Sequence, residues 1–362
     1  METQTKTLLE VKNLNIEYAA SNGTVHAVSD VSFTLGRGEI LGLAGESGCG
    51  KSTLAYGLTR LLRPPALITG GEVLYYPREE RARQTRLKEP VDILELSASQ
   101  LRKFRWNEVS IVFQSAMNAL NPVLTIGAQI DDVLRTHRPD MGSAARKSRA
   151  IELLDQVGIS AERIKSYPHE LSGGMRQRAV IAIALALSPE LIVMDEPTTA
   201  LDVVVQREIL QLISKLCKEF STALIFITHD LSLLLELSDS IAIMYAGKMI
   251  EKASSEAVYL HPRHPYSYGL LHSFPSLHGP QRRMVGIPGS PPDLRTLPSG
   301  CAFHPRCPFA FERCQTVEPV LQVAQAELPG QLVACHLYDQ GEAPSSSDFA
   351  QKFESMSEGV SA

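Results

Sequence analysis

The sequence has no excess of positive charge. Its 362 residues include 35 Lys and Arg against 40 Asp and Glu, so the formal net charge is -5. Proteins that bind nucleic acid without sequence preference depend on a basic surface that contacts phosphates. The composition therefore gives no support to a nucleic-acid partner, and we expect none.

Long hydrophobic runs are also missing. The longest unbroken apolar stretch, Ala179–Leu187, is far shorter than the roughly 20 residues that cross a bilayer. The N-terminal segment METQTKTLLEVKNL has no cationic part followed by an apolar run, as a secretory signal would. We therefore expect a globular chain that stays in the cytosol, where it can still act at a membrane by docking to an embedded partner.

One segment does carry a clear chemical pattern. The apolar run from Glu39 to Ala44 leads into GESGCGKS, which ends at Ser52, and helical spacing follows. Backbone N–H groups at such a strand–loop–helix junction point into a concavity where the helix N-terminus favours phosphate. Lys51 can place its cation on the β- and γ-phosphates, and the Ser52 hydroxyl suits Mg²⁺. The pattern predicts a nucleotide site.

Two acidic residues end the apolar strand LIVMD. Asp195 should lie at the carboxyl edge of the sheet beside the glycine loop, where it can hold magnesium through water. Glu196 is the candidate to orient and deprotonate an attacking water, a general-base role that contributes about 10² to 10⁴ in rate.

Two further polar residues follow strand-like runs and should reach the same edge. Gln114 follows VSIVF, and His229 follows LIFIT. The Gln114 amide can offer oxygen to magnesium and nitrogen to water, while His229 can donate to the γ-phosphate and sense its loss.

The segment LSGGMRQR predicts a second helix start that binds anions. Ser172 is a good N-cap, and Gly173 and Gly174 expose the backbone at the beginning of the helix. One nucleotide needs only one such cradle. We therefore expect this one to bind the γ-phosphate of a nucleotide held by a partner subunit, in a head-to-tail dimer with two composite sites.

The chain divides into regions of different composition. LLEVKNLNIEY and VHAVSDVSFTL alternate like antiparallel strands, residues of about 115–170 are mostly helical, and short apolar runs then alternate with helices up to Met244, as in a parallel sheet covered on both faces. We expect a nucleotide-binding domain over 1–258 and a separate module over 259–340 that is rich in proline and cysteine. We expect residues 341–362 to be disordered, and the charged segment 78–89 to be a solvated hairpin tip.

Taken together, GESGCGKS, Gln114, LSGGM, LIVMDE, TALD and His229 resemble the nucleotide-binding subunits of ATP-binding cassette (ABC) transporters over about residues 8–258. The resemblance implies an α/β fold: a RecA-like P-loop NTPase core with an antiparallel flank, an inserted helical subdomain and a small irregular C-terminal domain. Met175 stands where the family most often has Gln, which leaves the serine and glycines of the motif unchanged.

The same resemblance assigns residues to the nucleotide. Asp202 joins the two sites of the dimer, and Tyr18 stacks on adenine, which contributes about 1 to 3 kcal/mol; the alternative for Tyr18 is simple packing on the hairpin. The expected ATP-binding set is Tyr18, Gly45, Ser47, Gly48, Cys49, Gly50, Lys51, Ser52, Thr53, Gln114, Ser172, Gly173, Gly174, Asp195, Asp202 and His229. The expected catalytic residues are Lys51, Gln114, Glu196 and His229, and the expected Mg²⁺ ligands are Ser52, Gln114 and Asp195.

Other segments narrow the resemblance. SAMNALNP, EPTTALDVVVQ, HPRHPYSYGLL and IPGSPPDLRTLPSGCAFHPRCPFAFERC resemble the ATPase subunits of dipeptide and oligopeptide importers. The resemblance implies an ATPase, a translocase that uses Mg-ATP to drive peptide uptake. Its implied partners are two transmembrane permease subunits, an extracellular or periplasmic solute-binding protein, and a second ATPase subunit. That second subunit is either another copy of this chain or a paralogue, and we favour the paralogue. The implied location is the cytoplasmic face of the inner membrane, as a peripheral subunit.

Residues 115–130 should line a groove for a permease helix. Nickel and some sugar importers share the pattern, so the cargo stays open.

Rival members of the same superfamily fit less well. Soluble cassette ATPases of DNA repair need a long coiled coil between the glycine loop and LSGGM, and no sustained heptad run occurs here. Translation-type proteins carry two cassettes in tandem, and this chain has one. The C-terminal resemblance disfavours an exporter.

Four of the six cysteines lie beyond residue 300. Cys301, Cys307, Cys314 and Cys335 do not have the paired C-x2-C spacing of zinc ribbons, and disulfides are rare in the cytosol. We favour a [4Fe-4S] cluster with one iron for each thiolate. The alternatives are a zinc site, of the four cysteines or with His304 or His336, and thiols without a ligand.

Overall fold

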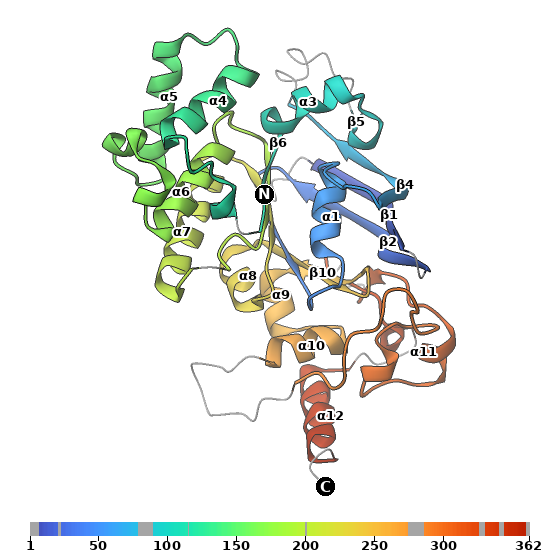
Figure 1. Ribbon diagram of the computed structural model, residues 1–362. Helices are drawn as coiled ribbons and strands as arrows, with labels where there is room; N and C mark the ends of the chain where they lie inside the picture. The colour runs from blue at the N-terminus through green and yellow to red at the C-terminus, as the bar shows by residue number, and fades with distance from the viewer. Residues whose placement is uncertain are drawn as a thin grey trace, which may run out of the picture.

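The computed structural model describes residues 7–20, 23–78, 90–114, 116–199, 201–273, 286–325, 330–339 and 344–359. Its centre is an eight-stranded sheet of order β11-β12-β10-β9-β3-β8-β7-β6. Figure 1 shows the chain with most of its helices gathered on one side of this sheet. Five neighbouring strands are parallel: β3 (Ile40–Ala44), β6 (Val109–Val112), β7 (Leu191–Asp195), β8 (Ala223–Ile227) and β9 (Ser240–Tyr245). Three antiparallel strands complete the sheet: β10 (Lys248–Ser254), β11 (Gln322–Val323) and β12 (Leu332–Val333).

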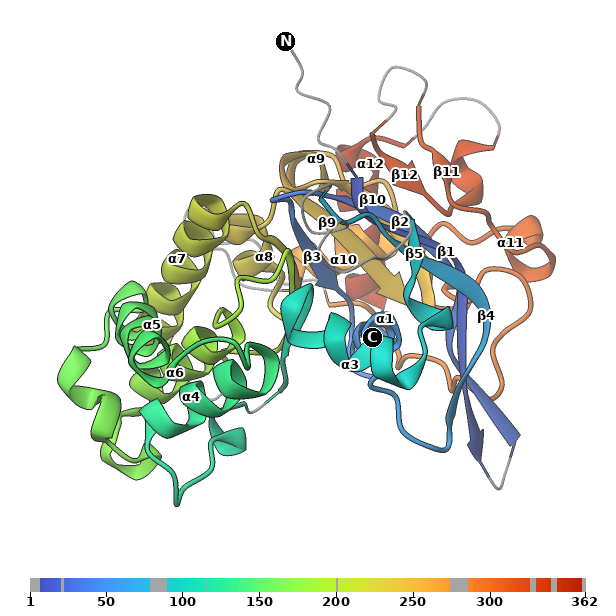
Figure 2. The ribbon, with the colours of Figure 1, turned by 90° about the horizontal axis from the view of Figure 1, so that it is seen from above.

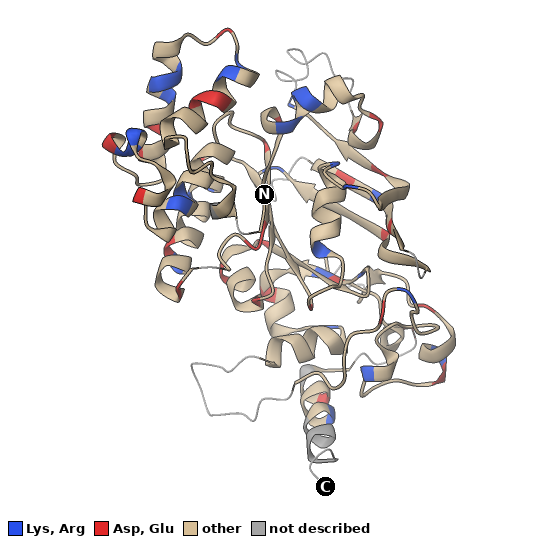
Figure 3. Cartoon of the chain, viewed as in Figure 1, with Lys and Arg blue, Asp and Glu red and all other residues tan. Residues whose placement is uncertain are grey.

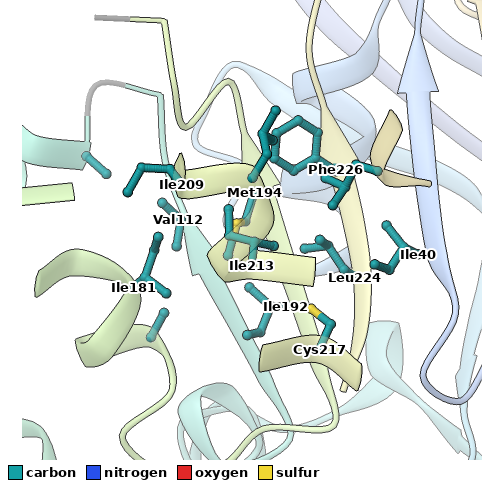
Figure 4. Close-up of a cluster of buried hydrophobic side chains, with 14 of the residues drawn as sticks. Ile40, Val112, Ile181, Ile192, Met194, Ile209, Ile213, Cys217, Leu224 and Phe226 are labelled. Atoms are coloured by element: carbon teal, nitrogen blue, oxygen red, sulfur yellow. The ribbon is translucent and has the colours of Figure 1, made fainter. Parts of the chain in front are cut away.

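The parallel strands are apolar throughout because both of their faces are covered. In β7, Leu191 and Val193 pack into one core, whereas Ile192 and Met194 pack into the other. Figure 4 shows the second of these cores, where Ile192 and Met194 meet side chains of the covering helices. A strand buried on both faces needs apolar residues at every position rather than at alternate ones.

The antiparallel flank predicted from the N-terminal sequence is confirmed. A four-stranded sheet has the order β2-β1-β4-β5 and contains β1 (Thr7–Ala20), β2 (Gly23–Gly36), β4 (Ala66–Tyr75) and β5 (Val91–Asp92). Helix α1 (Lys51–Leu58) lies between the two sheets (Figure 2), and Leu54 and Leu58 pack there with Leu14 and Ile16 of β1. The helix that follows the glycine loop is therefore fixed from both sides.

A second lobe consists of helices packed on the other face of the parallel strands. It contains α4 (Ile126–His137), α5 (Ser143–Gln156), α6 (Gly173–Ala184), α7 (Val203–Phe220) and α8 (Leu231–Leu237), with α3 (Ala98–Asn107) near β6. Single 3₁₀ turns occur at Ile93–Glu95, Ala116–Ala119, Ala161–Lys165, Pro168–Glu170, His304–Arg306 and His336–Tyr338. Basic and acidic residues are interspersed over both lobes, as the near balance of charge leads one to expect (Figure 3). Among the described residues, no helix combines the length and apolar character of a membrane span.

The C-terminal segment is joined to the main sheet. It contains α9 (Ser255–Leu260), α10 (Pro265–His272), α11 (Glu312–Thr316) and α12 (Ser346–Gly359), and its strand β12 pairs with β10. The Glu251 side chain of β10 is fully buried and accepts hydrogen bonds from the backbone N–H groups of Arg263 and His264 and from the Gln331 amide. Burial raises the pKa of Glu251. The segment after residue 258 therefore supplies the partners of a buried carboxyl group in the sheet.

The expectation of a disordered tail over 341–362 is wrong for the part that the structure describes, because α12 is a helix. Phe349 and Phe353 are one helical turn apart and are buried against Tyr268, with ring centroids 5.5 and 5.4 Å from that ring. These two aromatic residues give an otherwise polar helix an apolar stripe. The predicted hairpin tip at 78–89 lies, except for Arg78, outside the described residues.

Candidate functional site

The predicted site residues follow four strands that are neighbours in the sheet, in the order β3-β8-β7-β6. Gly45 comes directly after β3, His229 comes two residues after β8, Asp195 ends β7, and Gln114 comes two residues after β6. Because these strands are parallel, their carboxyl ends meet at one edge. The structure thus gathers four motifs that are separated by up to 184 residues (229 − 45) in the sequence.

The glycine loop has a shape that only glycine permits at two positions. Gly45 and Gly50 have φ angles of +143° and +104°. A Cβ atom at Gly45 would lie 2.3 Å from the Met244 carbonyl oxygen, and one at Gly50 would lie 2.2 Å from the Ala27 carbonyl oxygen. Both contacts are with backbone atoms, which cannot move aside. The loop is therefore wrapped tightly by its own chain at the start of α1.

Lys51 lies inside this loop. Its side chain is buried, and Nζ donates to the carbonyl oxygens of Gly45 at 2.7 Å and Glu46 at 2.9 Å. Cys49 is buried beside it, and burial raises the pKa of the Cys49 thiol. The cation is held by weak acceptors that a phosphate could replace, because charged oxygens make stronger hydrogen bonds than carbonyls do.

Ser52 and Asp195 form a pair of oxygen donors next to the loop. The Ser52 hydroxyl donates to Asp195 Oδ1 at 3.0 Å, and Asp195 is almost fully buried. Burial raises the pKa of Asp195, although the Ser52 hydrogen bond acts in the opposite direction. Burial and the Asp195 carboxylate raise the pKa of Tyr56 to about 12. A hydroxyl and a carboxylate side by side are the hard donors that Mg²⁺ prefers, so these residues fit that ion.

Glu196 is the centre of a second polar group at the same edge. Its Oε2 atom accepts hydrogen bonds from Gln114 Nε2 at 2.9 Å and Thr199 Oγ1 at 3.2 Å, and its Oε1 atom lies 3.4 Å from His229 Nδ1. The backbone has φ +46° at Glu196, a left-handed conformation that costs of order 1 to 3 kcal/mol in a residue other than glycine. A hydrogen bond from its N–H to the Ile227 carbonyl holds this turn. The structure therefore brings Gln114, Glu196 and His229 together.

Tyr18 also lies at the glycine loop. Its hydroxyl is 3.2 Å from Thr53 Oγ1, in the first turn of α1, and its side chain is partly exposed. The residue stands beside the phosphate cradle with its ring accessible.

The second glycine-containing helix start lies elsewhere. Ser172 is exposed and caps α6 by accepting from the Met175 N–H at 3.3 Å, while Asp202 caps α7 by accepting from the Val205 N–H at 3.0 Å. Helix α6 belongs to the helical lobe and α1 to the space between the sheets (Figures 1 and 2). In the described part of the chain, no hydrogen bond or ion pair joins residues 172–174 or Asp202 to residues 45–53. Within one chain, the two cradles remain apart.

Sequence reasoning gave no role at Glu196 or at the glycine loop to three residues that contact these motifs. Thr199 bonds the Glu196 carboxylate, and its position three residues after an acidic residue was the available signal. Tyr266 and Arg306 both contact Glu46 in the glycine loop. Tyr266 and Arg306 lie 220 and 260 residues after Glu46 in the sequence, and no local sequence pattern predicts these contacts.

The iron–sulfur prediction is wrong. Among the described residues, no group of three or more His, Cys, Asp or Glu side chains is arranged to hold a metal ion, which also removes the zinc alternative. All six cysteines are free thiols. Burial raises the pKa of Cys307 to about 12 and that of Cys335 well above its usual value, and Cys335 packs with Ala324 and Val333. Cys301 and Cys307 pack against the main hydrophobic core, so these thiols act as small apolar side chains.

Comparison with known proteins defines the class. Residues 28–199 match the ABC transporter family. A dimeric structure of the cassette MJ0796, bound to ADP and Pi, is 28% identical with a TM-score of 0.58 and aligns with 68% of this chain and 99% of that one. CbiO1 of Clostridium perfringens, part of the CbiONQ complex, is 26% identical with a TM-score of 0.58 over 70% and 91% of the two chains. The protein is an ATP-binding cassette ATPase.

The C-terminal segment and the full-length relatives place the chain in one family within this class. Residues 250–314 match the C-terminal region of oligopeptide/dipeptide transporters. The oligopeptide transport ATP-binding protein OppD of Escherichia coli is 42% identical over 92% of this chain and 94% of its own length. AppD of Bacillus subtilis is 42% identical over 92% and 98%. The chain belongs to this oligopeptide-transport family of ABC ATP-binding proteins.

Proposed function

We propose that this protein is the ATP-hydrolysing subunit of a peptide importer. The observation that carries the proposal is the convergence of Gln114, Glu196 and His229 on one edge of the sheet, beside the glycine loop that holds Lys51. The transport names of the relatives OppD and AppD support the cargo class, which is dipeptides or oligopeptides.

The residues at the edge divide the work of hydrolysis. Lys51 and the backbone N–H groups of residues 48–53 bind the β- and γ-phosphates, and Tyr18 stacks on adenine. Ser52, Asp195 and Gln114 would hold Mg²⁺, which would supply positive charge to neutralise the phosphate oxygens. Glu196 takes a proton from the attacking water, with its carboxylate held in place by Gln114 and Thr199. His229 donates to the γ-phosphate oxygen.

A second subunit completes each site. The helix start at Ser172, Gly173 and Gly174 binds the γ-phosphate of the nucleotide in the facing subunit, and Asp202 links the two sites. The dimeric arrangement of the related MJ0796 cassette supports this assembly. By analogy with the importers whose extension it shares, we propose a paralogue as the facing subunit.

The permease contact is a groove between the helical lobe and β6. It has a volume of about 540 Å³ and is lined by Trp106, Phe113, Leu120, Leu124 and Gln129 among others. Phe113 is 40% and Leu124 41% exposed, so apolar surface is available there. A short helix of a transmembrane permease subunit fits this chemistry. Phe113, which lines the groove, is the sequence neighbour of Gln114, so motion of Gln114 on ATP hydrolysis would be passed to the groove through Phe113. Ser115, at the start of the predicted 115–130 stretch, lies outside the described residues.

These roles imply an assembly at the membrane. We propose two permease subunits, a solute-binding protein outside the membrane that delivers peptide, and this chain bound peripherally at the cytoplasmic face. Residues 1–258 form the nucleotide-binding domain, with a helical subdomain at about 115–170, and residues 259–340 form the C-terminal domain.

Replacing Glu196 by Gln in the chromosomal gene tests the proposal. The purified variant should bind ATP as the wild type does, because Gln keeps the shape of the side chain, while turnover should fall by about 10² to 10⁴. Uptake of a labelled tripeptide by the cells should stop. Normal uptake, or loss of uptake of another solute only, would contradict the cargo assignment; normal turnover would contradict the role of Glu196.

A further inference from the structure

The C-terminal segment contacts the glycine loop at Glu46, the residue between Gly45 and Ser47. The Glu46 carboxylate accepts two hydrogen bonds from the Arg306 guanidinium, NH1 to Oε2 at 2.7 Å and NH2 to Oε1 at 3.0 Å. Such a two-point arginine–carboxylate contact fixes the orientation of both groups. A residue far along the chain therefore holds a side chain of the phosphate-binding loop.

Arg306 is itself fixed in place. It is only 7% exposed, and its Nε donates to the Pro288 carbonyl at 2.7 Å. NH1 also donates to the Tyr245 hydroxyl at 3.3 Å, and the guanidinium carbon lies 5.8 Å from the centre of the Tyr245 ring and 6.0 Å from that of Phe303. Removing one partner of such a sheltered pair would leave the other charge without compensation, so the contact fixes the two side chains relative to each other.

The backbone of Glu46 is held from the same side. Its N–H donates to the Tyr266 hydroxyl at 2.8 Å, and Tyr266 is fully buried. Its carbonyl oxygen accepts from Lys51 Nζ at 2.9 Å. Tyr266 and Arg306 thus fix a residue whose own carbonyl contacts the cation that is to meet the phosphates.

We infer that Arg306 and Tyr266 are positioning residues, which hold the glycine loop in its phosphate-binding conformation and so raise the affinity for ATP. The inference rests on the proposed role of the glycine loop as the ATP site. A loop that is already fixed loses less conformational entropy when the nucleotide binds. Arg306 also neutralises the Glu46 carboxylate, which would otherwise repel a triphosphate. A purely structural brace would change thermal stability and leave the affinity for ATP unaltered.

The test is titration of the full-length chain with a fluorescent ATP analogue, together with thermal unfolding in the absence of nucleotide. Arg306→Met should raise the Kd about tenfold, the equivalent of one lost charged hydrogen bond. Arg306→Lys should restore part of the affinity, since it keeps the charge and loses the two-point contact. Tyr266→Phe keeps the ring and removes one acceptor, so we expect a rise of about threefold. Arg295→Met is the matched control, because Arg295 pairs with Asp293 on the surface of the same segment.

A double-mutant cycle isolates the contact with the loop. Arg306→Met should add little to the loss caused by Glu46→Ala, because the two residues act as one unit. The inference is overturned if Arg306→Lys and Tyr266→Phe, which conserve the packing, both bind the analogue within about twofold of the wild type. It is also overturned if the losses from Glu46→Ala and Arg306→Met multiply. Failure of the wild type to bind the analogue, or unchanged binding by Lys51→Ala, would instead overturn the nucleotide site itself.

Discussion

The two helices with glycines at their start, α1 and α6, differ in whether contacts within the chain require glycine at those positions. At the start of α1, a side chain at Gly45 or Gly50 would collide with backbone oxygens at 2.3 and 2.2 Å. At the start of α6, a Cβ atom at Gly174 would lie 2.7 Å from the Val205 side chain, whereas one at Gly173 would make only an ordinary contact with Leu201, at 3.6 Å. The first pair of glycines is required by the fold of this chain. The fold gives no such reason for Gly173.

This difference indicates why glycine is present at each position. The loop before α1 is shaped by contacts within its own chain. Ser172 at the start of α6 is exposed, and in the described part of the chain no neighbouring atom requires glycine at Gly173. This contrast supports the proposal that the second cradle closes on a nucleotide held by another subunit. It also gives a direct way to separate the two by mutation.

Substitution in the first cradle should have the largest effect. Gly50→Ala places a methyl group against the Ala27 carbonyl and forces a φ of +104° on alanine. We expect a loss of stability of roughly 2 to 4 kcal/mol and loss of measurable nucleotide binding. Thermal unfolding and titration with a fluorescent ATP analogue on the full-length chain measure both effects. Normal nucleotide binding by Gly50→Ala would contradict the claim that the glycine loop before α1 requires glycine at this position.

Substitution in the second cradle should spare the isolated chain. Gly173→Ala should leave thermal unfolding and nucleotide affinity unchanged, because its methyl group would make only an ordinary contact with Leu201, at 3.6 Å. In the assembled transporter, turnover should fall by about tenfold or more, since the methyl group blocks approach of the phosphate. ATPase assays on the chain alone and on the reconstituted complex give the contrast. An unchanged rate in the complex would mean that this helix start has no partner.

Tyr18 sharpens the description of the first cradle. If its ring stacks on adenine, Tyr18→Ala should raise the Kd for ATP about tenfold, whereas Tyr18→Phe should bind nearly as the wild type does. If the ring merely packs on the strand, both variants should bind ATP equally well. The titration used for Gly50→Ala distinguishes the two cases.

Acid should affect only the first cradle, and by the smallest amount. Burial raises the pKa of Asp195, so this carboxyl group begins to take up a proton at a higher pH than an exposed aspartate does. Protonation removes the charge that holds Mg²⁺, so affinity for Mg-ATP should fall as the pH is lowered. The fall should begin at a higher pH than for binding of ATP without Mg²⁺. Identical pH profiles with and without the ion would contradict this role of Asp195.

Local sequence was enough to predict the parts of the site that lie at strand ends. Gly45, Gln114, Asp195 and His229 each follow a short apolar run, and the parallel arrangement of those runs brings them to one edge. The antiparallel flank was equally predictable, because alternation in β1 and β2 is a local property. Within the described residues, these elements lie where the patterns placed them.

The contacts made over long distances in the chain could not be predicted in this way. Neither the pairing of β12 with β10 nor the reach of Arg306 to Glu46 leaves a local trace. Helix α12 was not predicted because the composition of its segment is polar. The helix packs on the rest of the chain through two phenylalanines that contact Tyr268. The cysteine spacing led to the wrong prediction, because spacing says nothing about how side chains are turned or how deeply they are buried.

The pairing of β10 with β12 has a practical consequence for anyone who wishes to study the cassette alone. Cutting the chain after residue 258 would leave one side of β10 with unbonded N–H and C=O groups, an open edge that invites other strands to add. It would also strip Glu251 of the donors supplied by Arg263, His264 and Gln331. The change in composition near residue 258 is therefore a poor position at which to truncate the chain. We expect the truncated protein to aggregate, so that its ATP binding could not be measured.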